Sequence, residues 1–107
     1  MRAGKLRRRA SLQRKVVSQG TYGEENVSWA EYALVWAAVE PLTGREFVAA
    51  LGQGEQAVVS GRIRIRHRED VEAEDRVVVG GREYDIEAVV DDGLGRELQL
   101  LVRELTD

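Results

Sequence analysis

The chain has 107 residues, with 16 Lys and Arg against 19 Asp and Glu and a formal net charge of −3, and this length supports one domain with one hydrophobic core. The absence of cysteine excludes a disulfide scaffold, a thiolate metal site and a cysteine nucleophile, and the single histidine excludes a multi-histidine metal cluster. No apolar run approaches the roughly 18 residues of a membrane span, and none follows the basic N-terminus as in a secretory signal, so we expect a soluble protein made in the cytoplasm.

Positive charge is concentrated at the start of the chain. The first 15 residues hold seven Lys or Arg and no acid, while acids outnumber bases in the remainder. Such asymmetry indicates a partner of opposite sign, either nucleic acid or an acidic protein surface, although a frayed, solvated chain end is an equally good interpretation. We treat residues 1–9 as a basic N-terminal arm, whose candidate interface residues are Arg7, Arg8 and Arg9.

The next part of the chain predicts a strand and then a loop. Residues 6–17 place Ala10, Leu12 and Val16 on one side, which is the strand period. Residues 18–28 are polar and rich in turn formers, so they predict a loop.

A second strand is predicted over residues 29–40. It is apolar on both faces, and such a strand lies in the centre of a sheet or in an interface. Trp36 on this strand is a further interface candidate.

Residues 42–57 lack the strand period and predict an inserted helix and loop. Thr43 with Glu46 three residues later has the spacing of a helix capping box, and Gly52 suits a helix end, so we expect a short helix over residues 43–51. The Gly-Gln-Gly that follows lacks the lysine and the Ser or Thr of a phosphate-binding loop, so a flexible connection is the better interpretation.

The second half of the chain predicts four strands, at residues 57–67, 77–79, 82–90 and 96–104. Two consecutive glycines between the second and third of these indicate a tight hairpin turn. The side chains expected to face inward are Ile63, Ile65, Tyr84, Ile86, Ala88, Val90, Leu98, Leu100 and Val102.

About six strands and one short helix make the protein mainly β. Several short strands with glycine turns predict a small antiparallel β-barrel or sandwich, with the helix in a long inserted loop. Closing the sheet would also remove exposed edges that favour aggregation. We therefore expect residues 1–107 to form a single domain, with the basic arm at residues 1–9 and the insert at residues 42–57.

Two of the predicted strands carry rows of like charge on their outer faces. Each row has its charges at a spacing of two residues, so the side chains point the same way. Opposite charges on neighbouring strands contribute roughly 0.2–1 kcal/mol per pair. The rows predict either a charge ladder within one chain or the same ladder between copies in a ring, and both stay open. The basic row is Arg62, Arg64, Arg66 and Arg68, of which the first three are interface candidates, and the acidic row is Glu83, Asp85 and Glu87, all interface candidates.

No group of residues indicates catalysis, a cofactor or a metal. His67 lies between two arginines, and nothing is placed to complete a triad with it, so we expect a surface or interface residue. Residues 69–75 lack the spacing and central glycine of a calcium loop and predict a solvated acidic turn. We expect no enzyme. The alternative is a small nucleic-acid-binding barrel, which would need exposed aromatic residues among basic ones and steeply salt-dependent binding.

Several segments, in their order along the chain, are similar to those of one family. Residues 1–14 (MRAGKLRRRASLQR) resemble a short basic opening before a Leu-Gln-Arg motif, and residues 35–46 (VWAAVEPLTGRE) resemble a tryptophan strand that runs into a Pro-Leu-Ser/Thr-Gly corner. The stretches at 63–68, 76–86 and 97–104 follow in the same order. Over nearly its whole length the chain resembles the tailed-phage head–tail joining proteins, also called head-closure or stopper proteins.

The resemblance implies a small β-barrel subunit of a phage, a prophage or a gene transfer agent. It implies a structural connector, in which a homo-oligomeric ring docks on the portal or adaptor protein, closes the DNA-filled head and offers a surface to the tail terminator or tail-tube protein. The implied location is the head–tail interface of the virion, after assembly in the bacterial host cytoplasm, with packaged DNA nearby but not bound by sequence. Glu69-Asp70 departs from the family, which often has a proline and a glycine there, so the form of that turn stays open.

The insert has the qualities of a movable gate in such a ring, because a short helix flanked by glycines lacks a rigid strand pattern. We expect it to line or plug the channel. The basic arm suits docking better than DNA binding, since cationic side chains facing the channel would hinder the passage of DNA. The candidate gating residues are Gly44, Arg45, Glu46, Phe47, Gly52, Gln53 and Gly54.

Overall fold

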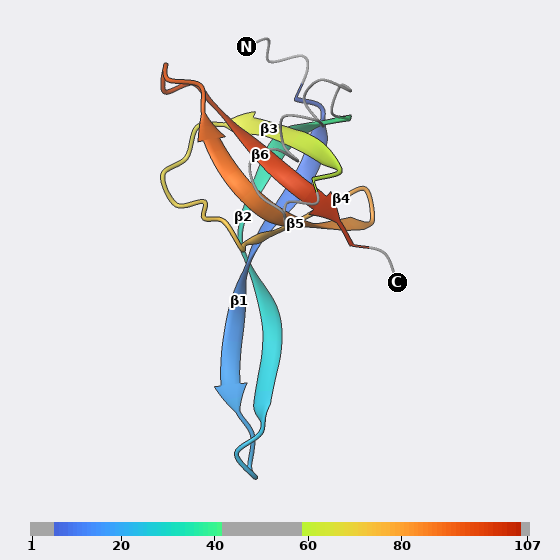
Figure 1. The fold of residues 1–107 in the computed structure, drawn as a ribbon, viewed down its shortest axis with the longest axis vertical. Helices are drawn as coiled ribbons and strands as arrows, with labels where there is room; N and C mark the ends of the chain where they lie inside the picture. The colour runs from blue at the N-terminus through green and yellow to red at the C-terminus, as the bar shows by residue number, and fades with distance from the viewer. Residues whose placement is uncertain (1–5, 42–58, 106–107) are drawn as a thin grey trace.

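The computed structural model describes residues 6–41 and 59–105, which form antiparallel strands closed into a barrel in the order β1-β2-β3-β6-β5-β4 (Figure 1). The predicted fold class, a mainly β protein with a small antiparallel barrel of about six strands, is confirmed. The helix expected at residues 43–51 lies outside the described residues. The strands are β1 (Arg8–Gln19), β2 (Glu25–Pro41), β3 (Gly61–Arg66), β4 (Arg76–Val79), β5 (Arg82–Asp91) and β6 (Glu97–Glu104).

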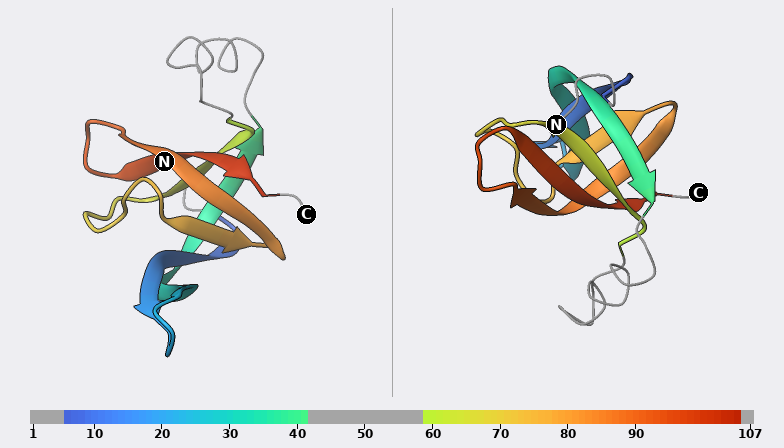
Figure 2. Two further views of the ribbon diagram at one scale, coloured as in Figure 1. Left: turned by 60° about the horizontal axis from the view of Figure 1, so that its bottom comes forward. Right: turned by 90° about the horizontal axis from the view of Figure 1, so that it is seen from above.

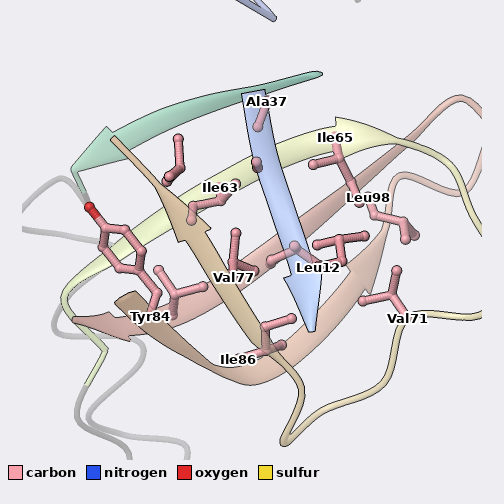
Figure 3. Close-up of a cluster of buried hydrophobic side chains, with 13 residues drawn as sticks. Leu12, Ala37, Ile63, Ile65, Val71, Val77, Tyr84, Ile86 and Leu98 are labelled. Atoms are coloured by element: carbon pink, nitrogen blue, oxygen red, sulfur yellow. The ribbon is translucent and has the colours of Figure 1, made fainter. Parts of the chain in front are cut away.

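Aliphatic side chains from the barrel strands fill its interior. Successive side chains of a strand point to opposite faces, so every second residue faces inward. The inward positions predicted for β3 and β6 are confirmed, as are Tyr84 and Ile86 of β5. Figure 3 shows how these side chains meet at the centre of the barrel. The largest fully buried side chains are Leu12, Ile63, Ile65, Val77, Ile86, Leu100 and Val102.

A short hairpin closes the barrel. Gly80 and Gly81 adopt φ values of 61° and 77°, and two consecutive residues of positive φ form the tight turn whose twist matches that of paired strands. The hairpin predicted from these glycines is thus confirmed. It brings β4 against residues 10–13 of β1, and this pairing joins the two ends of the sheet.

A β-bulge in β5 changes which of its residues face inward. The register against β6 shifts between Ile86 and Ala88, and one extra residue moves the following side chains to the opposite face. Val89 therefore packs against the core, and Val90 is 43% exposed. The prediction that Val90 faces inward is wrong for this reason, and Ala88 is only half-buried.

The first two strands continue well past the barrel as a hairpin (Figures 1 and 2). The loop predicted at residues 18–28 is wrong, because pairing runs on to Gln19 and Glu25 and leaves only residues 20–24 as the turn. Val16, expected on the inner side, is 44% exposed, since it lies beyond the barrel core. The molecule is correspondingly long, with extents of 49 × 31 × 26 Å.

Leu100 and Leu94 offer a matched test of the core. Leu100 is fully buried and Leu94 is 69% exposed. We expect Leu100→Ala to lower the free energy of unfolding by about 2–5 kcal/mol, because it removes buried methyl groups and leaves a cavity. Leu94→Ala should change it by less than about 0.5 kcal/mol. Urea denaturation followed by circular dichroism measures both, and equal effects would contradict this assignment of the core.

Candidate functional site

The hairpin beyond the barrel is a two-stranded ribbon with open edges. β1 has β4 as a second neighbour only at residues 10–13, and β2 has β3 only at residues 37–41. Among the described strands, none pairs with the outer edge of β1 after Gln13 or with that of β2 before Ala37. Unpaired backbone N–H and C=O groups along such edges can bind another strand.

The ribbon exposes aliphatic side chains on both faces. Val17 and Val27 pair across the two strands and so share one face, where they are 50% and 52% exposed. Val16 is exposed on the other face, and Tyr22 at the turn is 93% exposed. Exposed apolar side chains gathered on one element mark a surface for contact with another molecule.

A buried aspartate ties the root of this hairpin to the barrel. Asp75 is 3% exposed and directly precedes β4. Its carboxylate accepts hydrogen bonds from Nε and Nη2 of Arg14 on β1, at 3.0 and 2.8 Å, and from the Tyr32 hydroxyl on β2 at 2.7 Å. The backbone N–H of Glu72 donates a further bond at 3.1 Å. One carboxylate thus joins both strands of the hairpin to the start of β4.

Tyr32 reaches that carboxylate because β2 contains a β-bulge. Leu12 pairs with Ala33, but the next residue, Gln13, pairs with Glu31, so Tyr32 is the extra residue. A bulge bends its strand and increases the local twist. This one lies where the ribbon leaves the barrel, and it sets the direction in which the ribbon projects.

A second contact supports the root from the other face. The Arg76 guanidinium of β4 lies over the Trp29 ring of β2, with the guanidinium carbon 4.0 Å from the ring centroid. Trp29 pairs with Lys15 of β1. Arg14 and Lys15 are successive strand residues and face opposite ways, so Trp29 and the Asp75 contact hold the ribbon from its two sides.

The hydrogen bonds at the root shift the pKa of each ionisable group that forms them. Burial alone would raise the pKa of Asp75, but the hydrogen bonds from Arg14 and Tyr32 outweigh it and hold this pKa below its ordinary value. Burial, and then the hydrogen bond to Asp75, raise the pKa of Tyr32. The site therefore contains a carboxylate, a neutral phenol and a guanidinium at neutral pH.

The sequence prediction missed this aspartate. Residues 69–75 were expected to form a solvated turn, and Glu69, Asp70, Glu72 and Glu74 are indeed exposed. The expectation is wrong for Asp75, because its partner Arg14 is 61 residues away along the chain. No local pattern could have indicated that contact.

The acidic row of β5 forms ion pairs with arginines on the two neighbouring strands. Asp85 lies 3.1 Å from Arg103 on β6 and 3.5 Å from Arg76 on β4. Glu87 lies 3.3 Å from Arg103, and Glu83 lies 3.0 Å from Arg76. All three predicted acids are therefore paired within the chain.

The basic row of β3 forms its ion pairs with acids of β2 and β6, and not with those of β5. Arg62 lies 3.2 Å from Glu40 on β2, and Arg64 lies 3.5 Å from Glu40 and 3.0 Å from Glu97 on β6. Arg66 is exposed, with no ion pair among the described residues. Arg68 lies beyond the end of β3 and 2.8 Å from Asp70. Since β6 separates β3 from β5, the ladder predicted between the two rows within one chain is wrong. The ladder between copies stays a prediction.

Trp36 lies on the outer face of β2. The Arg9 guanidinium lies over its ring, with the carbon 4.6 Å from the centroid, and the two residues pair across β1 and β2. Trp36 and Leu34, two residues apart on the same face, are each 50% exposed.

The predicted basic arm runs into the first strand. Arg8 and Arg9 are the first residues of β1, and Arg7 directly precedes it. Residues 1–5 and all the candidate gating residues lie outside the described residues.

His67 is partly buried, and its Nε2 lies 3.3 Å from a carboxylate oxygen of Asp91. In the part of the chain that the structure describes, no three His, Asp or Glu side chains are grouped so that they could hold a metal ion. Over the same residues, none of the secondary structure is a helix with the length and apolar character of a membrane span.

Asp75→Asn tests the root of the hairpin. We expect it to lower the free energy of unfolding by about 1–3 kcal/mol, because it weakens the bonds to Arg14 and Tyr32 in a buried place. The folded-state pKa of Asp75 is lowered, so its stabilisation is complete above about pH 4 and is lost as the pH falls through the folded-state value.

The difference in stability between wild type and Asp75→Asn should therefore shrink below about pH 4. Urea denaturation between pH 7 and pH 3 measures it. Glu69→Gln, at an exposed carboxyl in the same turn, serves as the control and should behave like wild type. An unchanged stability, or a difference that grows in acid, would contradict the assignment.

Comparison with known proteins agrees with this architecture. A solution structure of protein SF1141 from Shigella flexneri 2a has a TM-score of 0.81 and 28% identity, and covers 100% of this chain and 99% of that one. A chain from the virion of a native gene transfer agent particle has a TM-score of 0.63 and 24% identity, over 95% and 97% of the two chains, and so shares the fold. No curated protein matches the chain significantly. The family model for the phage head completion protein matches residues 1–105, and the chain belongs to this family, as its resemblance to head–tail joining proteins predicted.

Proposed function

We propose that the chain is a structural connector subunit at the head–tail interface of a tailed phage, prophage or gene transfer agent particle. Copies form a homo-oligomeric ring that docks on the portal or adaptor protein, closes the DNA-filled head and presents a surface to the tail terminator or tail-tube protein. The ring assembles in the cytoplasm of the bacterial host and has no catalytic role. The observation that carries this proposal is the family match over residues 1–105.

The described surfaces suit contacts with protein better than contacts with nucleic acid. Arg62, Arg64, Arg76 and Arg103 each lie beside a carboxylate of the same chain, so they offer little uncompensated charge to phosphates. The open edges and exposed valines of the hairpin suit a protein partner. A nucleic-acid-binding barrel would instead bind DNA with a steep dependence on salt, which we do not expect here.

In this proposal the start of β1 and the outer face of β2 contact the adaptor or a neighbouring copy. The Arg9 guanidinium stacks on the half-exposed Trp36 ring at the outer surface of the barrel. An aromatic ring beside a guanidinium suits the centre of a protein interface. Arg7 and Arg8 lie next to this pair in the chain and add positive charge at the same end of β1.

Removal of the gene from its parent particle tests the proposed function. We expect DNA-filled heads and complete tails to accumulate separately, because nothing then closes the head or receives the tail. The same chain supplied from a plasmid should restore joined particles, which electron microscopy counts. Normal numbers of joined particles without the gene would contradict the proposal.

Residues 42–57, which lie outside the described residues, are proposed to line or plug the channel. Deleting residues 44–55 leaves every described strand in the chain, so the shortened protein should keep its β-sheet circular dichroism while the closed heads leak DNA. Nuclease sensitivity of the packaged DNA measures the leak. An unfolded protein, or heads as tight as those of wild type, would contradict this role.

A further inference from the structure

The two strands of the hairpin carry charges of opposite sign. β1 (RRASLQRKVVSQ) contains four basic residues and no acid, and β2 (ENVSWAEYALVWAAVEP) contains three acids and no base. In the ribbon itself, Lys15 on β1 and both Glu25 and Glu31 on β2 are exposed, and none of the three has an ion pair among the described residues. One edge of the ribbon is therefore positive and the other negative.

The ribbon also has the marks of an incomplete sheet. An isolated pair of strands is at best marginally stable in water and gains stability from a further strand or a packed face. Here both edges are open among the described residues, and Val17 and Val27 are about half exposed on one face. A strand added at either edge would bond to the free backbone groups and cover part of these valines.

We propose that the added strand belongs to the hairpin of a second copy, and that the β2 edge of one copy pairs with the β1 edge of the next. This inference rests on the proposed function, because it specifies a contact that builds the ring. Lys15 is level with Trp29 in the hairpin, and Glu31 is two residues from Trp29, so pairing of unlike edges at the same level brings Lys15 of one copy close to Glu31 of its neighbour. Pairing of like edges would set lysine against lysine or glutamate against glutamate, which is unfavourable.

Pairing of unlike edges repeats from copy to copy. Each copy uses its β2 edge for one neighbour and its β1 edge for the other, and a head-to-tail contact of this kind closes into a ring when the rotation between copies permits. β1 and β2 are antiparallel, so hairpins related by rotation about an axis along the ribbon would form one continuous antiparallel sheet. Val17 and Val27 share a face and would form a continuous apolar stripe across that sheet.

An exchange of charge between copies tests the inference. Lys15→Glu sets a glutamate against Glu31 of the next copy, and Glu31→Lys sets a lysine against its Lys15, so particles made with either variant alone should retain at least about tenfold fewer copies of the chain than wild type. When the two variants are produced together, alternating copies restore opposite charges at every contact. The mixture should therefore recover most of the wild-type number of copies.

Lys15 and Glu31 are also diagonal neighbours within one hairpin, and the mixture separates the two explanations, because an effect inside one chain is not rescued by another copy. Arg96→Glu, at an exposed arginine in the turn before β6, is the control for net charge and should behave like wild type. Circular dichroism of each purified variant verifies that it is folded.

Quantitative mass spectrometry of purified particles gives the number of copies of the chain in each particle. Loss with each variant and recovery in the mixture supports the inference. Normal retention of both single variants, or loss that the mixture does not reverse, overturns it, and the second result favours a strand from a different virion protein at these edges. Absence of the wild-type chain from the particles would contradict the proposed function itself.

Discussion

The position of the hairpin depends on one buried carboxylate. Asp75 sits where β1 and β2 leave the barrel, and it receives hydrogen bonds from Arg14 and Tyr32 together. Removing one member of a buried, charged hydrogen-bonded group leaves the others without partners, which costs more than the group contributes by forming. The contact therefore holds the hairpin in one direction, although it adds only modestly to the stability of the fold.

The barrel wall and the hairpin differ in how their charges are arranged. On the wall, carboxylates and guanidinium groups meet across neighbouring strands, as Asp85 does with Arg103 and Glu97 with Arg64. On the ribbon beyond Arg14, the charges of each strand are of one sign, and Lys15, Glu25 and Glu31 have no such partners among the described residues. A phage head completion protein needs surfaces for contact with other proteins, and among the described residues this contrast favours the ribbon as such a surface.

The barrel could be predicted from the sequence because its strands are buried on one face. The alternation of apolar and polar residues in β3 and β6, and the paired glycines between β4 and β5, correspond directly to the observed elements. Prediction failed at Val90, because a bulge that leaves no mark in the alternation shifts the register of β5. It failed again over residues 18–28, because a ribbon exposed on both faces has no apolar side to produce the strand pattern.

The hairpin is held at its base by the contacts of Asp75, so a small rotation there moves its far end the most. From Arg14 to Gln19 the ribbon spans about 17 Å at the usual rise per strand residue, and the exposed ring of Tyr22 lies beyond that. A rotation of about 10° at the base of the hairpin would displace its far end by about 3 Å, which is comparable to the length of a hydrogen bond. The position of the turn around Tyr22 therefore depends on the side chains around Asp75, at the opposite end of the hairpin.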